Sequence, residues 1–408
     1  MKVLQINAVY GSGSTGRICM ELNNALVKNG DEGNVIFARG KTLDTNALAV
    51  SSALGVKVGG LMARLTGYNA GFSPVATSRI IRKIKQYKPD LVHLHNLHGN
   101  YVHVKKLLRF LGKEDIATVI TLHDCWFFTG KCTHYTSAKC DKWQTGCRHC
   151  PQLKKDIPSW FFDRTAKMWK DKKELFSAIP RLAVVGVSNW ITNEGKKSFL
   201  GNAKIIKRIY NWIDLDVFYP RTDNVFAKYG VLEDKFTVLC IGAGWKDGTS
   251  RFDDLLALSN RLPKDMQIVL VGGVETEKQL PPNVKAIGYV HSVEELAKLY
   301  SQANVYVHLS REDTFGKVIA EAMACGTPAI VYHSTACPEL IGENCGYVVE
   351  TGDLDSVLEA ILAVKKDGKA KYSNYCIEFV KENFEKEKLL SETLQLYQSL
   401  VKGATECI

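Results

Sequence analysis

The chain has 408 residues, of which 46% are hydrophobic and 24% are charged, and its formal net charge is +10. A chain of this length is too long for one ordinary core, so we expect two domains. The composition is that of a soluble globular protein with no apolar run long enough to cross a bilayer, which argues against an integral membrane protein.

The positive charge favours anionic substrates or surfaces, and a peripheral membrane contact is one expectation that follows from it. Nucleic acid is not an expected partner, because the sequence has no recognisable reading motif and no aromatic platform interleaved with basic residues. We expect a cytoplasmic protein, in which the twelve cysteines would be thiols or metal ligands more often than disulfides.

The chain begins with a predicted strand, residues 3–7, whose apolar part is too short for a signal peptide. A glycine-rich loop, residues 11–16, follows it and precedes a helix predicted from about Arg17. This order fits the G-x-G-x-x-G pattern of dinucleotide-binding folds. The next strand ends in Arg39 without an acidic residue for a ribose, so an NADP-linked oxidoreductase is one alternative. A glycine-rich turn needed only for close packing is another.

Two later strands carry or precede histidines. The predicted strand over residues 91–95 places His93 and His95 on one face, and the strand over residues 117–122 is followed by His123. Two histidines on one face are compatible with metal ligation. Hydrogen-bonded histidines inside the fold are the more ordinary explanation of the same pattern.

A cysteine-rich insert is predicted over residues 125–160. It contains Cys132, Cys140, Cys147 and Cys150. Four thiolates suit a tetrahedral zinc site, which would hold together a segment too polar to fold on a core of its own. The zinc would be structural, because four cysteines leave no open position for catalysis. Two disulfides or buried thiols are the alternatives.

The most informative stretch lies in the second half of the chain. A predicted strand over residues 305–309 runs into a polar loop, and a helix opens near Gly316 and ends before Gly326. The next strand, residues 329–332, makes this a strand–loop–helix–strand unit of a parallel sheet, where ligands lie beyond the carboxyl ends of the strands. The backbone N–H groups at the start of the helix suit a phosphate.

Two carboxylates lie on either side of this expected phosphate site. Asp313 is in the loop and Glu321 is in the helix. Such a pair suits hydroxyl groups on the two arms of a diphosphate, a sugar on one side and a ribose on the other. The alternative is that Asp313 only caps the helix while the Glu321 side chain is solvated on its outer face.

The stretch from Asp313 through Phe315 and Gly316 to Glu321 resembles the donor-binding motif of the retaining GT-B glycosyltransferases of family 4. In that family a first acid is followed by Phe-Gly and, after seven intervening residues, by a second Glu. The first acid of this chain is Asp rather than Glu, one methylene shorter.

The resemblance implies an α/β protein with the GT-B fold, in which two Rossmann-like, doubly wound domains face a central cleft. The N-terminal, acceptor-binding domain would span residues 1–212 and carry the cysteine-rich insert. The C-terminal, nucleotide-sugar-binding domain would span residues 213–385. A single helix is predicted from about residue 373 to residue 401, and the resemblance implies that the C-terminal helical part, residues 386–408, packs back on the first domain.

The resemblance also assigns roles to single residues. Asp313 would contact the donor sugar, and Glu321 would hold the nucleotide ribose. His123 would point at the sugar, with an electrostatic and positional role rather than that of a nucleophile. Lys246 and Arg251, which follow the strand predicted over residues 236–241, the first of the second domain, would neutralise the leaving diphosphate without a metal ion. The other donor-binding residues that the resemblance implies are Gly13, Gly16, Gly244, Thr314, Phe315, Gly316 and Lys317.

The implied reaction transfers a sugar from a UDP- or GDP-sugar to a hydroxyl of a glycan or lipid-linked acceptor, with retention of configuration. It would serve the biosynthesis of a cell-surface polysaccharide, need no cofactor, and take place at or near the inner face of the membrane. The NADP-linked oxidoreductase is one alternative. A non-catalytic binding protein on a degenerate GT-B scaffold is the other.

Overall fold

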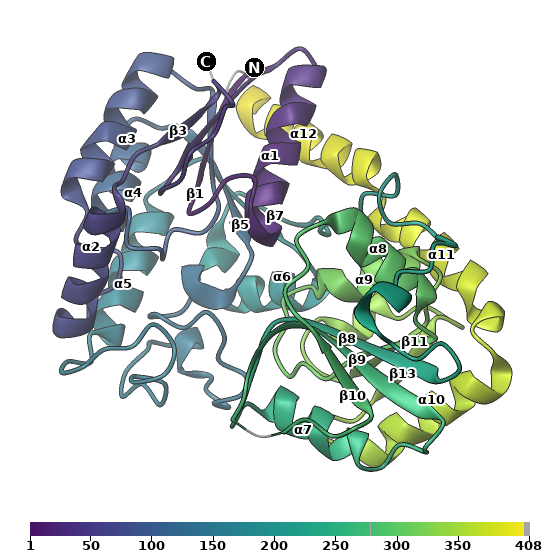
Figure 1. Cartoon of the computed structure of the whole chain (residues 1–408). Coiled ribbons are helices and arrows are strands. Elements are labelled where there is room, and N and C mark those ends of the chain that lie inside the picture. The colour runs from purple at the N-terminus through teal and green to yellow at the C-terminus, as the bar shows by residue number, and fades with distance from the viewer. Residues whose placement is uncertain (278, 404–408) are drawn as a thin grey trace. The chain divides into compact units, whose positions relative to one another are not determined.

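The computed structural model describes residues 1–277 and 279–403. The chain divides into two compact units, which are coloured by residue number in Figure 1. Unit 1 consists of residues 1–209 and the C-terminal stretch from Leu390, and unit 2 is Tyr210–Leu389. The boundaries expected from the sequence, after residues 212 and 385, lie a few residues away. No helix in the described part of the chain is both long and apolar enough to span a bilayer.

Unit 1 is built on a seven-stranded parallel sheet with the order β3-β2-β1-β4-β5-β6-β7. Its strands are β1 (Lys2–Asn7), β2 (Glu32–Phe37), β3 (Ala47–Ala49), β4 (Leu91–Leu94), β5 (Ala117–Leu122), β6 (Leu182–Gly186) and β7 (Ile205–Arg208). Its α-helices before the domain boundary are α1 (Gly13–Lys28), α2 (Ala53–Thr66), α3 (Pro74–Tyr87), α4 (Val104–Lys113), α5 (Thr165–Ser177) and α6 (Asn189–Lys197). Short 3₁₀ helices are η1 (Cys125–Phe127), η2 (Lys142–Gln144) and η3 (Phe199–Asn202).

Unit 2 contains a six-stranded parallel sheet with the order β10-β9-β8-β11-β12-β13. The strands are β8 (Phe236–Lys246), β9 (Met266–Glu275), β10 (Val284–Ile287), β11 (Val305–His308), β12 (Ala329–Tyr332) and β13 (Gly346–Val349). The helices are α7 (Ser250–Ser259), α8 (Val293–Gln302), α9 (Lys317–Ala324), α10 (Leu354–Asp367) and α11 (Ala370–Phe384), with 3₁₀ helices η4 (Ala227–Tyr229) and η5 (Cys337–Leu340). The last helix, α12 (Lys386–Lys402), begins in unit 2 and continues in unit 1.

Both sheets follow the doubly wound pattern. In each unit the chain first builds outward from one strand and then returns to place the next strand on that strand's other side, so the order reverses between β1 and β4 and between β8 and β11. Ligands of such sheets bind beyond the carboxyl ends of the strands at the reversal point. The interior strands are buried on both faces, as the apolar runs predict.

Three predicted element boundaries are wrong. Helix α1 begins at Gly13 rather than near Arg17, so the second half of the glycine-rich loop is the first helical turn. Strand β8 continues to Lys246, because β9 is equally long and pairs with it again beyond a bulge after Ile241. The single helix expected over residues 373–401 is two helices, since Glu385 is extended and pairs with the backbone of Ile213.

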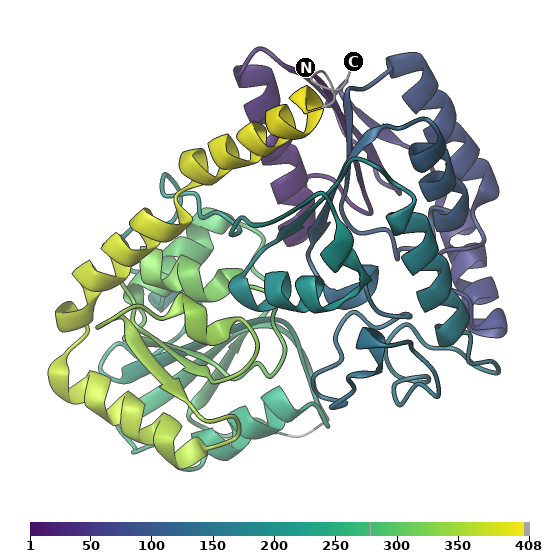
Figure 2. The ribbon, with the colours of Figure 1, turned by 180° about the vertical axis from the view of Figure 1, so that it is seen from behind.

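Helix α12 joins the described C-terminal residues to unit 1. Figures 1 and 2 show α2 to α5 on one face of the unit 1 sheet, and α1 with the end of α12 on the other. The Tyr397 hydroxyl of α12 lies 2.5 Å from Nδ1 of His93 in β4. Lys207 of β7 forms an ion pair of 2.9 Å with Glu392. Both Tyr397 and His93 are buried, so the contact belongs to the core of unit 1.

We expect Tyr397→Phe to lower the free energy of unfolding by about 1–2 kcal/mol, because a buried His93 nitrogen loses its partner while the ring stays in place. Urea unfolding followed by circular dichroism measures the change. Tyr375→Phe is the matched control, since that ring is 51% exposed and should shift stability by less than about 0.5 kcal/mol. Equal unfolding midpoints for the two variants would contradict the buried contact.

Candidate functional site

Asp313 lies in the loop after β11, where hydrogen bonds to His308, Thr335 and Ala336 hold it in place. Nε2 of His308, the last residue of β11, lies 2.7 Å from Oδ2 of Asp313. The Asp313 N–H donates to Oγ1 of Thr335 over 2.9 Å, and the Asp313 carbonyl accepts from the N–H of Ala336 over 3.2 Å. The loop is therefore tied both to β11 and to the segment after β12. The Asp313 side chain is still 31% exposed, so its carboxylate reaches the surface from a fixed position.

His308 has a second partner. Its Nδ1 lies 3.1 Å from the hydroxyl of Tyr306, and both side chains are buried in the sheet. Cys337 of η5 completes a group in which ligand atoms of His308, Asp313 and Cys337 lie within 4.8 Å of one another. Burial and the Asp313 charge keep the pKa of the Cys337 thiol well above its usual value. The hydrogen bond between His308 and Asp313 accounts for this proximity without a metal ion.

Helix α9 carries the second acid. It begins after Gly316, whose φ of +85° and close neighbour Ile319 exclude a larger residue. Glu321 is only 6% exposed, and its Oε2 accepts a hydrogen bond of 3.2 Å from Tyr300 of α8. Burial and the Glu321 charge raise the pKa of Tyr300, so the tyrosine remains a donor.

The simpler alternative for the two acids is wrong. The N-cap of α9 is Gly316, with no side-chain cap, so Asp313 does not cap the helix. Glu321 is buried rather than solvated. Because burying a carboxylate costs free energy unless it is hydrogen-bonded, a buried acid in this position indicates a constraint beyond helix formation.

The two predicted cations have different environments. Arg251, in the first turn of α7, lies over the ring of Trp245 at 4.3 Å and donates from Nη2 to the carbonyl of Gly244 over 2.8 Å. Lys246, at the end of β8, lies 3.7 Å from Glu275, and both side chains are largely exposed. An exposed pair of this kind contributes little. Arg251 is thus the better oriented of the two.

The remaining predicted donor residues of unit 2 lie in the loop between β11 and α9, at the start of α9, and in β8. Phe315 is 2% exposed and packs on the rings of Tyr210 and Phe384, so it supports the loop from below. Thr314 and Lys317 are half-buried, and Gly244 is exposed on β8.

The glycine-rich segment of unit 1 serves close packing at one position. A Cβ on Gly16 would lie 3.1 Å from Cγ2 of Val9, and the carbonyl of Gly16 accepts from the N–H of Gly11 over 3.0 Å. The packing explanation therefore applies to Gly16. Gly13 has a φ of +64° and open space where a Cβ would be.

Three histidines lie at or beside the ends of β4 and β5. The Gln5 amide donates to the carbonyl of Cys19 over 3.1 Å, which presents its oxygen to Nε2 of His95, also at 3.1 Å. His95 must therefore donate from Nε2 and accept at Nδ1, where Nε2 of His123 lies 3.0 Å away. His93 contacts Thr121 at 2.8 Å. The predicted position of His123 at the strand end is correct, and its Nε2 faces a histidine.

Burial keeps these rings neutral. It lowers the pKa of His93 to about 3 and that of His123 to about 4, and it lowers the pKa of His95 well below its usual value. The mutual repulsion of the rings, were they charged, acts in the same direction for His93 and His95. A neutral ring stack can orient a substrate through hydrogen bonds, but it carries no positive charge at neutral pH.

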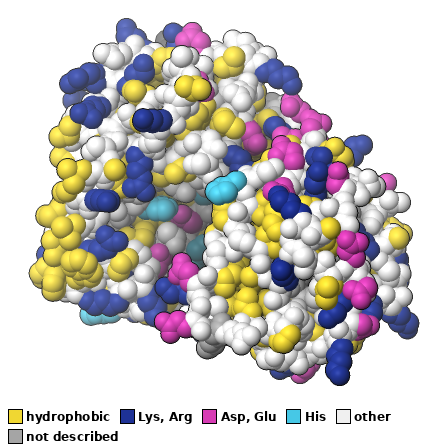
Figure 3. All heavy atoms as spheres, in the orientation of Figure 1, with side chains coloured by type: hydrophobic (Ala, Val, Ile, Leu, Met, Phe, Trp, Pro, Cys, Tyr) yellow, Lys and Arg dark blue, Asp and Glu magenta, His cyan; other side chains and the backbone are white. Residues whose placement is uncertain are grey.

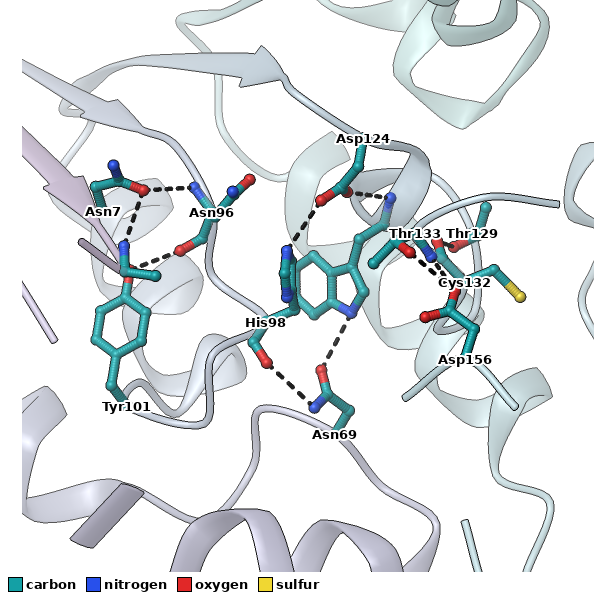
Figure 4. Close-up of polar contacts among 12 residues, drawn as sticks. Asn7, Asn69, Asn96, His98, Tyr101, Asp124, Thr129, Cys132, Thr133 and Asp156 are labelled. Carbon is teal, nitrogen blue, oxygen red and sulfur yellow. Dashed lines mark hydrogen bonds and ion pairs between the residues drawn. The ribbon is translucent and has the colours of Figure 1, made fainter. Parts of the chain in front are cut away.

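A polar network beside this stack was missed by sequence reasoning as a site (Figure 4). Oδ2 of Asp124 lies 2.9 Å from Nε2 of His98, and Oδ1 accepts from the N–H of Trp126 over 2.8 Å. The Trp126 indole donates to Asn69 over 3.1 Å. Burial raises the pKa of Asp124, but the bonds from His98 and Trp126 outweigh it and the pKa is lowered.

One sequence signal could have identified this network: two of its members follow predicted strands. Asp124 follows β5 closely and His98 follows β4, and these strands are neighbours in the sheet. Asn7 ends β1 and accepts from the N–H groups of Ala8 and Asn96, again at the reversal point. Asn69, which lies before α3, carried no such signal.

The cysteine-rich insert is held by buried lysines. Nζ of Lys131 donates to the carbonyls of Leu153, Asp156 and Ile157 at 2.6–3.0 Å. Nζ of Lys172, in α5, does the same for Trp126, Thr129 and Gly130 at 2.5–3.4 Å. Burial lowers the pKa of Lys172 to about 7. These two ammonium groups organise loops that have only 3₁₀ helices of their own.

The four predicted zinc ligands are free thiols that do not form a closed site. A hydrogen bond joins Cys132 to Cys150, lowering the pKa of Cys150 and raising that of Cys132. Cys147 accepts from the N–H of Gly130 over 3.1 Å. No three of the four sulfur atoms, all in the described part, lie within 4.8 Å of one another. Tetrahedral zinc needs sulfurs about 3.8 Å apart, so Cys140 and Cys147 would have to move, and zinc stays a prediction.

Metal analysis tests the zinc prediction. We expect one zinc ion per chain after gel filtration, and less in Cys132→Ser and Cys150→Ser, with a lower melting temperature after chelation because metal binding stabilises the folded state. Cys19→Ala, a buried cysteine of α1, is the control and should keep its metal. A metal-free protein whose melting temperature ignores the chelator would contradict the prediction. A mass lowered by lost hydrogens would show disulfides instead.

The neutral histidines predict a loss of stability in acid. Because the folded-state pKa values of His93 and His95 lie below the usual 6.5, their contribution is complete above that pH and is lost as the pH falls toward about 3. At pH 5 the loss is about 2 kcal/mol per histidine. Urea unfolding at pH 7 and at pH 5 measures it.

His93→Gln should remove about a third of this pH dependence, because the pKa values of His93, His95 and His123 are all lowered by burial. The exposed His291→Gln serves as the control and should leave it unchanged. Identical pH dependence in the parent and in His93→Gln would show that His93 takes up protons equally in both states.

Comparisons with known proteins agree with the geometry. A family model described as glycosyltransferase family 4 matches residues 15–217, and one described as glycosyl transferases group 1 matches residues 235–367. The WcaC protein of Escherichia coli, named for a glycosyl transferase of colanic acid biosynthesis, is 25% identical over 76% of this chain and 77% of its own length. The N-acetyl-alpha-D-glucosaminyl L-malate synthase of Bacillus anthracis is 29% identical over 54% of this chain and 60% of its own.

Solved structures show the same fold. Sucrose-phosphate synthase from Thermosynechococcus elongatus superimposes with a TM-score of 0.73 at 18% identity, over 99% of this chain and 100% of that one. HepE of Anabaena, in complex with UDP and glucose, gives a TM-score of 0.63 at 16% identity, over 98% and 100%. Two doubly wound parallel sheets and the two family matches lead to one conclusion: the chain is a GT-B protein and belongs to the family 4, group 1 glycosyltransferases.

Proposed function

We propose that the protein transfers a sugar from a nucleoside-diphosphate sugar to a hydroxyl of a glycan or lipid-linked acceptor, with retention of configuration, in the synthesis of a cell-surface polysaccharide. The observation that carries the proposal is the pair of anchored acids at the carboxyl end of β11. Asp313 is oriented by His308, and Glu321 is buried in α9. The names of the relatives support a polysaccharide product, and the UDP complex of HepE supports a nucleotide-sugar donor.

Each part of unit 2 has a role in this proposal. The start of α9 receives the diphosphate, because its N–H groups and dipole favour an anion. Glu321 accepts hydrogen bonds from the ribose hydroxyls, and Asp313 accepts them from the donor sugar. Arg251, with Lys246 beside it, stabilises the charge that grows on the diphosphate as the sugar leaves. No resident cofactor takes part in this scheme.

The reaction needs no side chain as nucleophile. The acceptor hydroxyl attacks the anomeric carbon from the face that the phosphate leaves, so the new glycosidic bond has the old configuration. The bond between the anomeric carbon and the phosphate oxygen breaks, and the acceptor proton passes to that oxygen. The protein lowers the barrier by orienting the two bound reactants and by stabilising the negative charge that develops on the diphosphate.

The alternatives have less support. The NADP-linked oxidoreductase was suggested by the glycine-rich segment, residues 11–16. The match to the glycosyltransferase family begins at residue 15, at the end of that segment. Helix α1 also begins within that segment, and Gly16 is explained by packing. A non-catalytic binding protein would keep the nucleotide site and lose turnover, so it makes a different experimental prediction.

Thermal shift with UDP, GDP, ADP and NADP tests the donor site. One nucleoside diphosphate should raise the melting temperature of the parent by mass action. In Glu321→Gln its affinity should fall by about tenfold or more, because a charged acceptor of the ribose hydroxyls is lost. Glu312→Gln, the neighbouring half-buried acid of the loop, is the control and should keep the shift.

An NADP shift that Glu321→Gln leaves unchanged would refute the proposed donor site and restore the oxidoreductase alternative. Turnover separates the enzyme from the binding protein: slow hydrolysis of the matching nucleotide sugar, reduced in Asp313→Asn, is expected only of a transferase. The anomeric configuration of a product, read by nuclear magnetic resonance, decides between retention and inversion.

A further inference from the structure

Helix α2 exposes its large apolar side chains. Leu54, Val58 and Leu61 are 71%, 50% and 44% exposed, and their spacing of four and three residues places them on one face. The opposite face packs on the rest of unit 1, and the buried residues of α2 there are all small: Gly59, Gly60 and Ala63. A Cβ on Gly59 would lie 2.9 Å from the Asn100 carbonyl, so this position of the inner side has no room for a larger residue.

An aromatic loop continues this face. Trp160, Phe161 and Phe162 are 44%, 68% and 53% exposed, and each ring meets the next edge to face. The N–H of Trp160 donates to the carbonyl of Arg64, in the last turn of α2, over 2.8 Å. Gly67, with a φ of +71°, lies so close to the Phe162 carbonyl that a Cβ would be 2.0 Å from it. The rings are therefore held beside the end of α2.

We call Leu54, Val58, Leu61, Trp160, Phe161 and Phe162 the α2 patch. Figure 3 shows hydrophobic side chains gathered over α2 on the left of the molecule, with lysine and arginine side chains among and above them. An apolar surface of this kind, without a covering element, marks an interaction site more often than a monomer surface.

The segment that contains α2 is rich in basic residues, whereas the aromatic loop is followed directly by one exposed acid, Asp163, and one exposed base, Arg164. Residues 45–89, which include α2 and α3, contain seven lysines and arginines and no aspartate or glutamate. The basic residues are Lys57, Arg64, Arg79, Arg82, Lys83, Lys85 and Lys88. Lys57 and Arg64 are exposed on the same helix as the three aliphatic residues, and Arg164 lies over the ring of Phe162 at 5.6 Å.

We propose that the α2 patch docks on the surface of an anionic lipid bilayer. Helices that lie in the membrane interface carry leucine, tryptophan and phenylalanine on one face and lysine and arginine beside it. The α2 patch has the same composition, with the aromatic residues supplied by the loop. The aliphatic side chains and aromatic rings enter the boundary between headgroups and acyl chains, where tryptophan is favoured. The basic border meets the negative headgroups, each charge adding to the attraction.

A bilayer fits this surface better than a protein does. The α2 patch is a helix face and a loop, and the exposed Lys57, Arg64 and Arg164 belong to the same two segments. A protein partner would need an acidic rim to match these basic residues, whereas an anionic membrane supplies negative charge over its whole surface. The inference is independent of the donor proposed above, because it rests on unit 1 alone.

Vesicle sedimentation of the full chain tests the inference. Phosphatidylcholine vesicles are compared with an equal mixture of phosphatidylcholine and phosphatidylglycerol, at low and at high salt. The parent should bind the anionic vesicles, bind phosphatidylcholine much more weakly, and be released by salt. Two triple variants, L54S/V58S/L61S and W160S/F161S/F162S, should each weaken binding by about tenfold or more.

The matched control is Leu232→Ser with Tyr375→Ser, because these unit 2 residues are similarly exposed, at 52% and 51%. It should bind as the parent does, and all variants should melt near the parental temperature, since the altered side chains are on the surface.

Three results would overturn the inference. They are equal vesicle binding by parent and triple variants, no binding of the folded parent to anionic vesicles, and a loss of oligonucleotide binding in the variants with vesicle binding intact. The last would assign the surface to nucleic acid.

Discussion

The hydrogen bond between His308 and Asp313 is the constraint on which the loop between β11 and α9 depends. It joins the end of β11 to the loop that precedes α9, and the backbone of Asp313 joins the same loop to the segment after β12. An aspartate is one methylene shorter than the glutamate expected of the family. Its carboxylate cannot reach as far from the loop, so a fixed loop position has to compensate. A buried histidine, itself bonded to Tyr306, provides a partner that cannot drift.

Buried ionisable groups occur in both units, with different partners. In unit 2 the buried carboxylate of Glu321 accepts a hydrogen bond from the Tyr300 hydroxyl. In unit 1 burial neutralises a stack of histidines, so that His95 and His123 interact as hydrogen-bonding groups rather than as charges. The family resemblance predicted an electrostatic role for His123. A ring whose pKa is lowered to about 4 can contribute only its dipole and its hydrogen bonds at neutral pH, which narrows that role to positioning.

The fold and the position of the loop between β11 and α9 were predictable, because they depend on local signals. Short continuous apolar runs identify the strands, helical periodicity identifies the helices, and Gly316 marks the start of α9. The pairing of His308 with Asp313 was not predictable, since it depends on how far a loop turns back on its own strand. The break at Glu385 was also hidden, because one extended residue leaves the helical periodicity on both sides unchanged.

Long-range contacts explain the remaining differences. The extension of β8 depends on the matching length of β9, some distance along the chain, and it places Lys246 on a strand instead of a loop. The network of Asp124, His98 and Asn69 assembles from three separate connections, of which two follow neighbouring strands. A sequence shows that a polar residue ends a strand. Only the sheet order shows which strand ends meet.

Helix α2 shows how a periodic pattern can identify a face without giving its direction. Leu54, Val58 and Leu61 recur at helical spacing and would ordinarily be assigned to the core. The small residues decide otherwise: Gly59 and Gly60 are buried on the inner side, and the backbone carbonyl of Asn100 passes too close to Gly59 for a side chain there. A helix that packs through glycine approaches its neighbour closely, and its larger side chains must then face outward. The glycines, which reduce helix stability by about 1 kcal/mol each, are thus the signal that the apolar face of α2 is turned outward.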